Sequence, residues 1–98
     1  TVYYIYIIDE KERLKGVTSL RDMLLSAPDV PLSDVMETKL KTVAPDADQY
    51  DAAEIISKYN LLALPVVDED GELLGIVTID DIMDILLPPL SKKKRRKI

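Results

Sequence analysis

The stretch LPVVDEDGELLGIVTIDDIM at residues 64–83 decides the fold, because residues 5–24, IYIIDEKERLKGVTSLRDML, repeat its pattern. The two stretches align without a gap at an offset of 59 residues, the distance from Asp9 to Asp68 (68 − 9). A repeat of this length indicates two copies of one structural unit whose apolar faces are buried together. The identical pairs are Asp9/Asp68, Glu10/Glu69, Leu14/Leu73, Gly16/Gly75 and Asp22/Asp81.

Each copy predicts a strand, a polar turn, a second strand and a helix. The strands are short runs rich in β-branched and aromatic residues, and Asp70-Gly71 is a strong hairpin signal between the later two. Ser19 and Thr78 are expected to cap the helices, which Pro28 and Pro88 stop. The predicted strands are residues 3–8, 14–18, 64–67 and 73–77, and the predicted helices are residues 20–26 and 79–87.

One more helix is predicted between the copies. Asp48 is a good N-cap with Asp51 three residues later, and the residues that follow supply an apolar face. Before it, residues 40–43 are expected to form a short strand that ends at Pro45. The second copy is therefore a complete β-α-β-β-α unit, and the first lacks its opening strand and helix. We predict an α/β (α+β) fold with a half repeat at residues 1–28, a complete repeat at 29–88 and a basic tail at 89–98.

The composition argues against an enzyme. The chain of 98 residues has no cysteine and no histidine, which removes disulfides, thiolate or imidazole metal sites and the usual nucleophile pairings. No glycine-rich phosphate loop with an associated lysine is present. Asp80 and Asp81 are adjacent, so on a helix they point about 100° apart and do not form an acid/base pair. A bound metal would have to be a hard ion on oxygen ligands.

Charge is distributed unevenly along the chain. Residues 1–90 hold all 18 acidic residues and seven of the 13 basic ones, a net charge of −11 (7 − 18), whereas residues 92–97 are all basic. The acidic body attracts cations and repels nucleic acid. The tail could contact phosphates or anionic lipid, and the ordinary alternative is a solvated, disordered end.

No membrane segment or signal peptide is predicted. No apolar run reaches the roughly 18 residues needed to cross a bilayer, and the opening TVYYIYIID is typical of a strand. We therefore expect a soluble chain or a soluble piece of a larger protein, and the start at Thr1 without an initiator methionine favours a piece.

The motif Gly, two apolar residues, Ser or Thr, two further residues and Asp occurs as GVTSLRD at 16–22 and GIVTIDD at 75–81. With LSDVM at 32–36, it resembles the CBS domain. Within that family the sequence is most similar to MgtE-type magnesium transporters. The resemblance implies a cytosolic module, on the cytoplasmic side of the membrane, that forms a homodimer and acts on a membrane transport domain. It also implies that magnesium binds acidic residues and closes the pore, and that ATP tunes this response.

The same motif suggests where a nucleotide would bind. The Ser19 and Thr78 hydroxyls beside free helix amides suit a phosphate, and the carboxylates of Asp22 and Asp81 suit ribose hydroxyls. Plain helix capping is the ordinary alternative for these residues. By resemblance the adenine slot lies near Tyr4 and Ile5 in the first copy, and near Leu61, Leu64 and Pro65 in the second. These residues could also be strand core. Arg21 could neutralise phosphates or could simply be exposed.

Acidic residues at helix ends are the candidate magnesium ligands. Magnesium prefers one or two carboxylates plus retained waters, so its sites are often shared between surfaces. Acidic residues at helix N-termini are also expected from the helix dipole alone. The candidates are Asp48, Asp51, Asp80 and Asp84.

The sequence therefore predicts a regulatory module that senses magnesium, adenine nucleotide or both, and gates a magnesium transporter. Two alternatives stay open: a general nucleotide-binding CBS module attached to an enzyme or another transporter, and a dimerisation unit that binds nothing.

Overall fold

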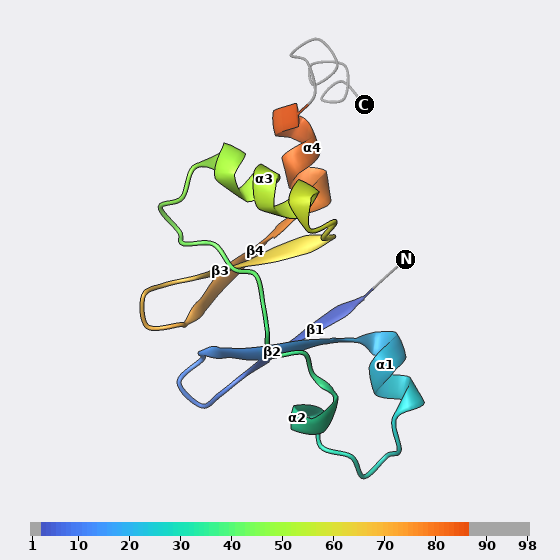
Figure 1. Ribbon diagram of the computed structural model, residues 1–98. Helices are drawn as coiled ribbons and strands as arrows, with labels where there is room; N and C mark the ends of the chain where they lie inside the picture. The colour runs from blue at the N-terminus through green and yellow to red at the C-terminus, as the bar shows by residue number, and fades with distance from the viewer. Residues whose placement is uncertain (1–2, 87–98) are drawn as a thin grey trace, which may run out of the picture. The chain divides into compact units, whose positions relative to one another are not determined.

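The computed structural model describes residues 3–86, which form an α+β fold with two small antiparallel sheets (Figure 1). The described chain separates into two compact units. Unit 1 contains residues 3–40 and 67–73, and unit 2 contains residues 41–66 and 74–86. The elements in chain order are β1 (Tyr4–Ile8), β2 (Leu14–Ser19), α1 (Leu20–Leu25), α2 (Leu32–Val35), α3 (Gln49–Lys58), β3 (Ala63–Val67), β4 (Leu73–Thr78) and α4 (Ile79–Leu86).

Unit 1 is built on the antiparallel hairpin of β1 and β2. The register places Tyr4 opposite Ser19 and Ile7 opposite Gly16, with an irregularity between Ile7 and Ile8. Helix α1 follows β2 directly and ends at Ser26, whose hydroxyl donates to the carbonyl of Asp22 (2.9 Å). The outer edge of β2 is paired as well, because Val17 forms a bridge with the segment after α2.

The two hairpin turns are held by equivalent aspartates. In the first turn, one carboxylate oxygen of Asp9 accepts the backbone N–H groups of Lys11 and Arg13, both at 2.9 Å. In the second, Asp68 accepts the N–H groups of Asp70 and Glu72, also at 2.9 Å. Short acidic side chains favour such local turns because they satisfy backbone donors that a turn leaves unpaired. The aspartate that is repeated in the sequence therefore makes the same pair of hydrogen bonds in each turn.

The two turns also pair with each other inside unit 1. The N–H of Leu14 donates to the carbonyl of Gly71 (2.8 Å), and the N–H of Leu73 donates to the carbonyl of Glu12 (2.9 Å). This contact brings carboxyl groups together. A hydrogen bond with the Glu12 side chain, burial and the nearby Asp68 carboxylate raise the pKa of Glu72 above its usual range.

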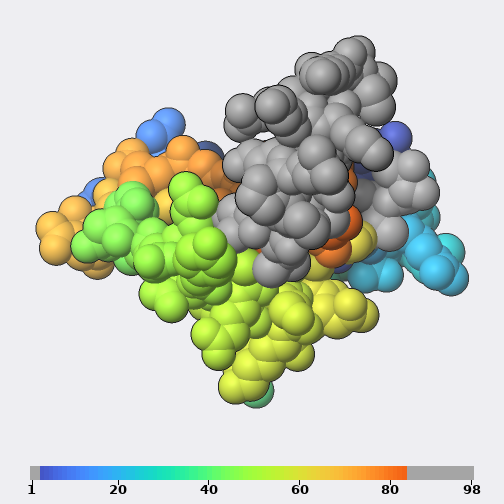
Figure 2. All heavy atoms as spheres, turned by 90° about the horizontal axis from the view of Figure 1, so that it is seen from above, coloured from blue at the N-terminus to red at the C-terminus, as the bar shows by residue number. Residues whose placement is uncertain are grey.

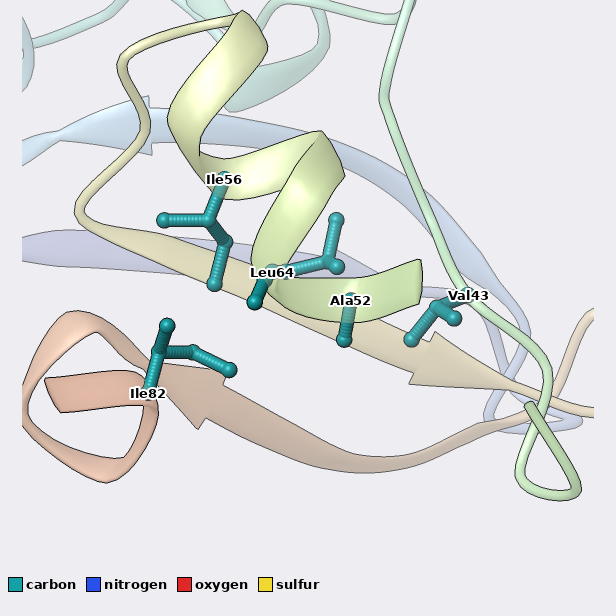
Figure 3. Close-up of a cluster of buried hydrophobic side chains, with 6 residues drawn as sticks. Val43, Ala52, Ile56, Leu64 and Ile82 are labelled. Atoms are coloured by element: carbon teal, nitrogen blue, oxygen red, sulfur yellow. The ribbon is translucent and has the colours of Figure 1, made fainter. Parts of the chain in front are cut away.

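Unit 2 is organised around a small buried cluster (Figure 3). One face of α3 packs over β3, and α4 contacts α3 and contributes Ile82 to the same cluster. Leu64 of β3 lies at the centre and is 0% exposed. The other face of α3 is open at the surface in Figure 2, where it is coloured lime green. The buried hydrophobic residues are Val43, Ala52, Ala53, Ile56, Leu64 and Ile82.

Most predicted elements are confirmed within a residue or two, but the strand predicted at residues 40–43 is wrong. Only Val43 pairs there, through a single bridge to Val66 in which its N–H donates to the carbonyl of Pro65 (3.0 Å). Lys41 and Thr42 are exposed, so no alternating apolar face holds the rest of the segment against the sheet. Helix α2 was not predicted. The last residue of the helix predicted at 79–87 and the tail predicted at 89–98 lie outside the described residues.

Gly71 offers a test of the second turn. Its φ of 86° is a left-handed conformation that costs a residue with a Cβ about 1–2 kcal/mol. We expect Gly71→Ala to lower the free energy of unfolding by roughly that amount in urea denaturation. Gly75→Ala is the matched control, because a Cβ there meets nothing within 4 Å. Equal loss in both variants would contradict this account of the turn.

Asp9 offers a test of the first turn. Hydrogen bonds from the Arg13 backbone, the Arg13 guanidinium (2.8 Å) and the Lys11 backbone lower the pKa of Asp9 from 3.8 to about 2, although burial opposes them. Because the pKa of Asp9 is lower in the folded chain than in the unfolded chain, its ionised carboxylate stabilises the fold at pH values above 3.8. This stabilisation is lost as the pH falls from 3.8 towards 2. Asp9→Asn should therefore melt at a lower temperature than the parent at pH 7, with the difference closing across that range. Glu10→Gln is the control, and a difference independent of pH would refute the assignment.

Candidate functional site

The joint between β2 and α1 carries the first candidate site. Ser19 is the N-cap of α1, and its hydroxyl oxygen accepts the N–H of Asp22 (3.0 Å). The cap uses only the backbone of Asp22. Among residues 3–86 the Asp22 carboxylate accepts no hydrogen bond and forms no ion pair, and the residue is exposed. The joint thus presents a free carboxylate beside a fixed hydroxyl.

An open groove of about 820 Å³ runs along this joint. The β1–β2 register sets Tyr4 against Ser19, and the N–H of Leu20 donates to the carbonyl of Tyr3 (2.9 Å), which ties the start of α1 to the start of β1. The groove is therefore bordered by the Tyr4 ring and by apolar side chains of α1. Its lining residues are Tyr3, Tyr4, Ser19, Leu20, Arg21, Asp22, Leu24 and Leu25.

The equivalent joint in unit 2 is closed by its own side chains. The Asp81 carboxylate accepts the backbone N–H of Thr78 (3.2 Å) and the Thr78 hydroxyl (3.1 Å), and the Thr78 oxygen accepts the N–H of Asp81 (3.4 Å). This is a complete capping box. Asp81 also borders a pocket of about 360 Å³ that Asp48, Ala52 and the loop before α3 line. The two copies thus use the same motif differently.

The remaining predicted nucleotide residues lie in several environments. Ile5 is half-buried and pairs with Thr18 in the hairpin. Leu61 packs against the buried cluster, Leu64 is part of it, and Pro65 is buried. The structure therefore brings together Tyr4, Ser19, Arg21 and Asp22 around one groove, and it gathers the second set mainly into the core of unit 2.

The predicted magnesium ligands do not form a cluster. Asp48 caps α3 by accepting the N–H of Tyr50 (2.7 Å), and Asp51 and Asp80 are exposed in the first turns of α3 and α4. The Asp84 side chain lies outside the part of the chain that the structure describes. Within that part, no three acidic residues are placed to hold a metal ion. A divalent ion on these residues would keep most of its waters or share ligands with another surface.

The sequence patterns did not predict several residues that line the groove in unit 1 and the pocket in unit 2. Leu24 and Leu25 of α1 are 71% and 74% exposed, and with Tyr3 they line the first groove. The loop at residues 43–49 lines the second pocket. Pro45 followed by the N-cap Asp48 was a usable signal, because it indicates a turn held at the start of a helix. Within residues 3–86, no helix is both long and apolar enough to span a membrane.

Comparison with known proteins identifies the class. The sequence pattern that defines the CBS domain matches residues 32–88, more than half of the chain. The chain therefore belongs to the CBS domain family, and the order α3, β3, β4 and α4, with a single Val43–Val66 bridge in place of an opening strand, agrees with that assignment.

The chain also closely matches the cytosolic CBS region of MgtE magnesium transporters. It is 49% identical over 86 residues to the magnesium transporter MgtE of Thermus thermophilus, an alignment that covers 88% of this chain and 19% of that protein. It matches the crystal structure of the cytosolic domain of the Mg²⁺ channel MgtE in complex with ATP with a TM-score of 0.82 and 48% identity, covering 87% of this chain and 34% of that one.

An enzyme is also among the relatives. Inosine-5'-monophosphate dehydrogenase of Nitrosopumilus maritimus is 28% identical over 90 residues, 92% of this chain and 19% of that enzyme. The chain thus spans 19% of the length of both the transporter and the dehydrogenase.

Proposed function

We propose that this chain is a regulatory CBS module that binds an adenine nucleotide and responds to magnesium, and that it acts on the membrane domain of a magnesium transporter from the cytoplasmic side. The Asp22 carboxylate carries the proposal. It lines an open groove with Tyr4, Ser19 and Arg21 and has no partner within residues 3–86, whereas Asp81 is occupied by Thr78. The match to an MgtE cytosolic domain crystallised with ATP supports the choice of nucleotide.

The chemistry of the groove fits the parts of a nucleotide. Ribose hydroxyls donate to a carboxylate, and two such bonds to one charged group are stronger than bonds between neutral groups. An adenine ring stacks on an aromatic face, which Tyr4 offers, and a guanidinium such as that of Arg21 pairs with phosphate. The body of the chain is acidic, so a bare polyphosphate is repelled. A magnesium-bound nucleotide carries less negative charge and is the favoured form.

Asp22→Asn tests the nucleotide site. Loss of a charged acceptor for ribose should weaken binding of magnesium-bound ATP about tenfold or more, measured by calorimetry on the chain. Asp29→Asn, an exposed carboxylate in the same unit that does not line the groove, is the control and should bind like the parent. The proposal fails if neither ATP nor AMP binds the parent chain, or if both variants bind equally well.

We further propose that magnesium acts by bridging acidic surfaces of two copies. A net charge of −11 over residues 1–90 makes two copies repel, and a divalent ion held by one or two carboxylates lowers that repulsion. Because the acidic candidates are dispersed within residues 3–86, each ion would be shared between copies rather than enclosed in one.

Sedimentation tests this role of magnesium. Magnesium chloride should increase the dimer fraction and the melting temperature beyond sodium chloride of the same ionic strength. The double change Asp48→Asn and Asp51→Asn should reduce that difference, and Glu54→Gln on the same helix should not. An identical response to both salts would exclude specific bridging by magnesium.

The similarity to a dehydrogenase favours one alternative, a general nucleotide-binding module that regulates an enzyme. Nucleotide binding with no response to magnesium would support it. If neither ligand binds and the chain still dimerises, the chain is a dimerisation unit.

A further inference from the structure

The contact between the two hairpin turns of unit 1 brings charged side chains together. Arg13 and Glu72 form an antiparallel bridge, which is flanked by two backbone hydrogen bonds of 2.8 and 2.9 Å. Neither of these bonds uses the backbone N–H of the bridged residues themselves. The bridge is therefore a non-hydrogen-bonded pair, the kind in which opposing side chains lie closest together. The side chain opposite Glu72 is that of Arg13.

Arg13 does not neutralise Glu72, because its guanidinium is bound to Asp9. The Arg13 Nε donates to Asp9 Oδ2 at 2.8 Å, and the Lys15 ammonium lies 3.7 Å from the same oxygen. These are the only ion pairs within residues 3–86. In that part of the chain the turn contact therefore contains a glutamate without a basic partner.

Glu12 adds a second carboxyl group to the contact. Its φ of 64° is a left-handed conformation that residues with a Cβ rarely adopt, and its side chain forms a hydrogen bond with that of Glu72. The Asp68 carboxylate also lies near Glu72 and accepts that residue's backbone N–H. An ionised carboxylate has no hydrogen to donate, so a hydrogen bond between two carboxyl groups requires one proton.

A proton fits this contact better than a metal ion does. Among the residues that the structure describes, no three acidic side chains are placed to hold a metal. A proton needs only two oxygens, and a hydrogen bond from a carboxylic acid to a carboxylate is strong because it is charge-assisted. The bond with Glu12, burial and the Asp68 carboxylate together raise the pKa of Glu72, so they favour its protonated form.

We propose that the paired turns of unit 1 form a proton-dependent contact, in which one proton shared between Glu72 and Glu12 strengthens the pairing and its release weakens it. The proton comes from the solvent and lies on Glu72, which donates to the Glu12 carboxylate. When it is released, two carboxylates face each other and repel. This contact gives the module a response to acidification that is separate from nucleotide and magnesium.

The direction of the pH dependence follows from Glu72. Because its pKa is higher in the folded chain than the ordinary value of 4.5, the stabilisation is fully present below pH 4.5 and is lost as the pH rises above it. Asp9 acts in the opposite direction and in a different range, between pH 3.8 and about 2. Measurements above pH 4 therefore report on the turn contact and not on Asp9.

Carbon-13 NMR of the glutamate carboxyl groups tests the shared proton on the full chain. Glu72 should titrate above 4.5, and Glu12→Gln should move its midpoint down to that value or below. Glu10→Gln, an exposed residue of the same turn, is the matched control and should leave the midpoint unchanged. Glu12→Gly, which suits a left-handed backbone, is the second variant if glutamine perturbs folding. A midpoint at or below 4.5 in the parent, or one that both Glu12 variants leave in place, would overturn the proposal.

Hydrogen exchange tests whether the proton strengthens the contact. The Leu14 and Leu73 amides donate across it, so their protection, corrected for the intrinsic pH dependence of exchange, should rise at least about threefold from pH 7 to pH 4. Glu72→Gln should show the higher protection already at pH 7, and Glu69→Gln in the same turn should behave like the parent. The Val43 amide in unit 2 is the reference. Protection independent of pH, the same response in Glu72→Gln, or an equal rise at Val43 would overturn the proposal.

Discussion

The hydrogen bond from the N–H of Asp22 to the Ser19 hydroxyl fixes the point where a strand becomes a helix. Because β2 runs directly into α1 without a loop, this cap sets the direction of the helix and with it the positions of the α1 side chains that border the groove. The same joint in unit 2 is made by Thr78 and Asp81. The candidate ligand site therefore lies where a side chain caps the unpaired backbone N–H groups at the start of a helix.

The two copies of the motif differ in the contacts that their equivalent side chains make. Among residues 3–86 the Asp22 carboxylate has no hydrogen-bond partner, whereas the Asp81 carboxylate accepts two hydrogen bonds from Thr78. A Cβ added at Gly16 would meet the Met36 side chain, whereas one added at Gly75 meets nothing within 4 Å among residues 3–86. Backbone N–H groups donate to the Asp9 carboxylate in one turn and to the Asp68 carboxylate in the other, which keeps the two hairpins alike. The differences lie in other side chains and in neighbouring segments. The two copies therefore present different groups at equivalent positions of the repeat.

Local signals made much of this fold predictable. Asp48, Ser19 and Thr78 act as caps where the sequence places them, and Gly71 takes the left-handed turn that Asp70-Gly71 indicates. Val43 was misjudged because a short strand depends on a distant partner, and only one bridge to β3 forms. The groove was partly predictable: its polar residues follow from the motif, but Leu24 and Leu25 became visible only once α1 was placed against β1.

The most direct test of the central claim is an amide NMR titration of the chain with magnesium-bound ATP. If the cap between β2 and α1 builds the nucleotide site, the largest shift changes will fall on Tyr4 and on residues 19–22, and Asp22→Asn will remove them. Changes confined to α3 and α4, or the same changes in Asp22→Asn, would contradict the account.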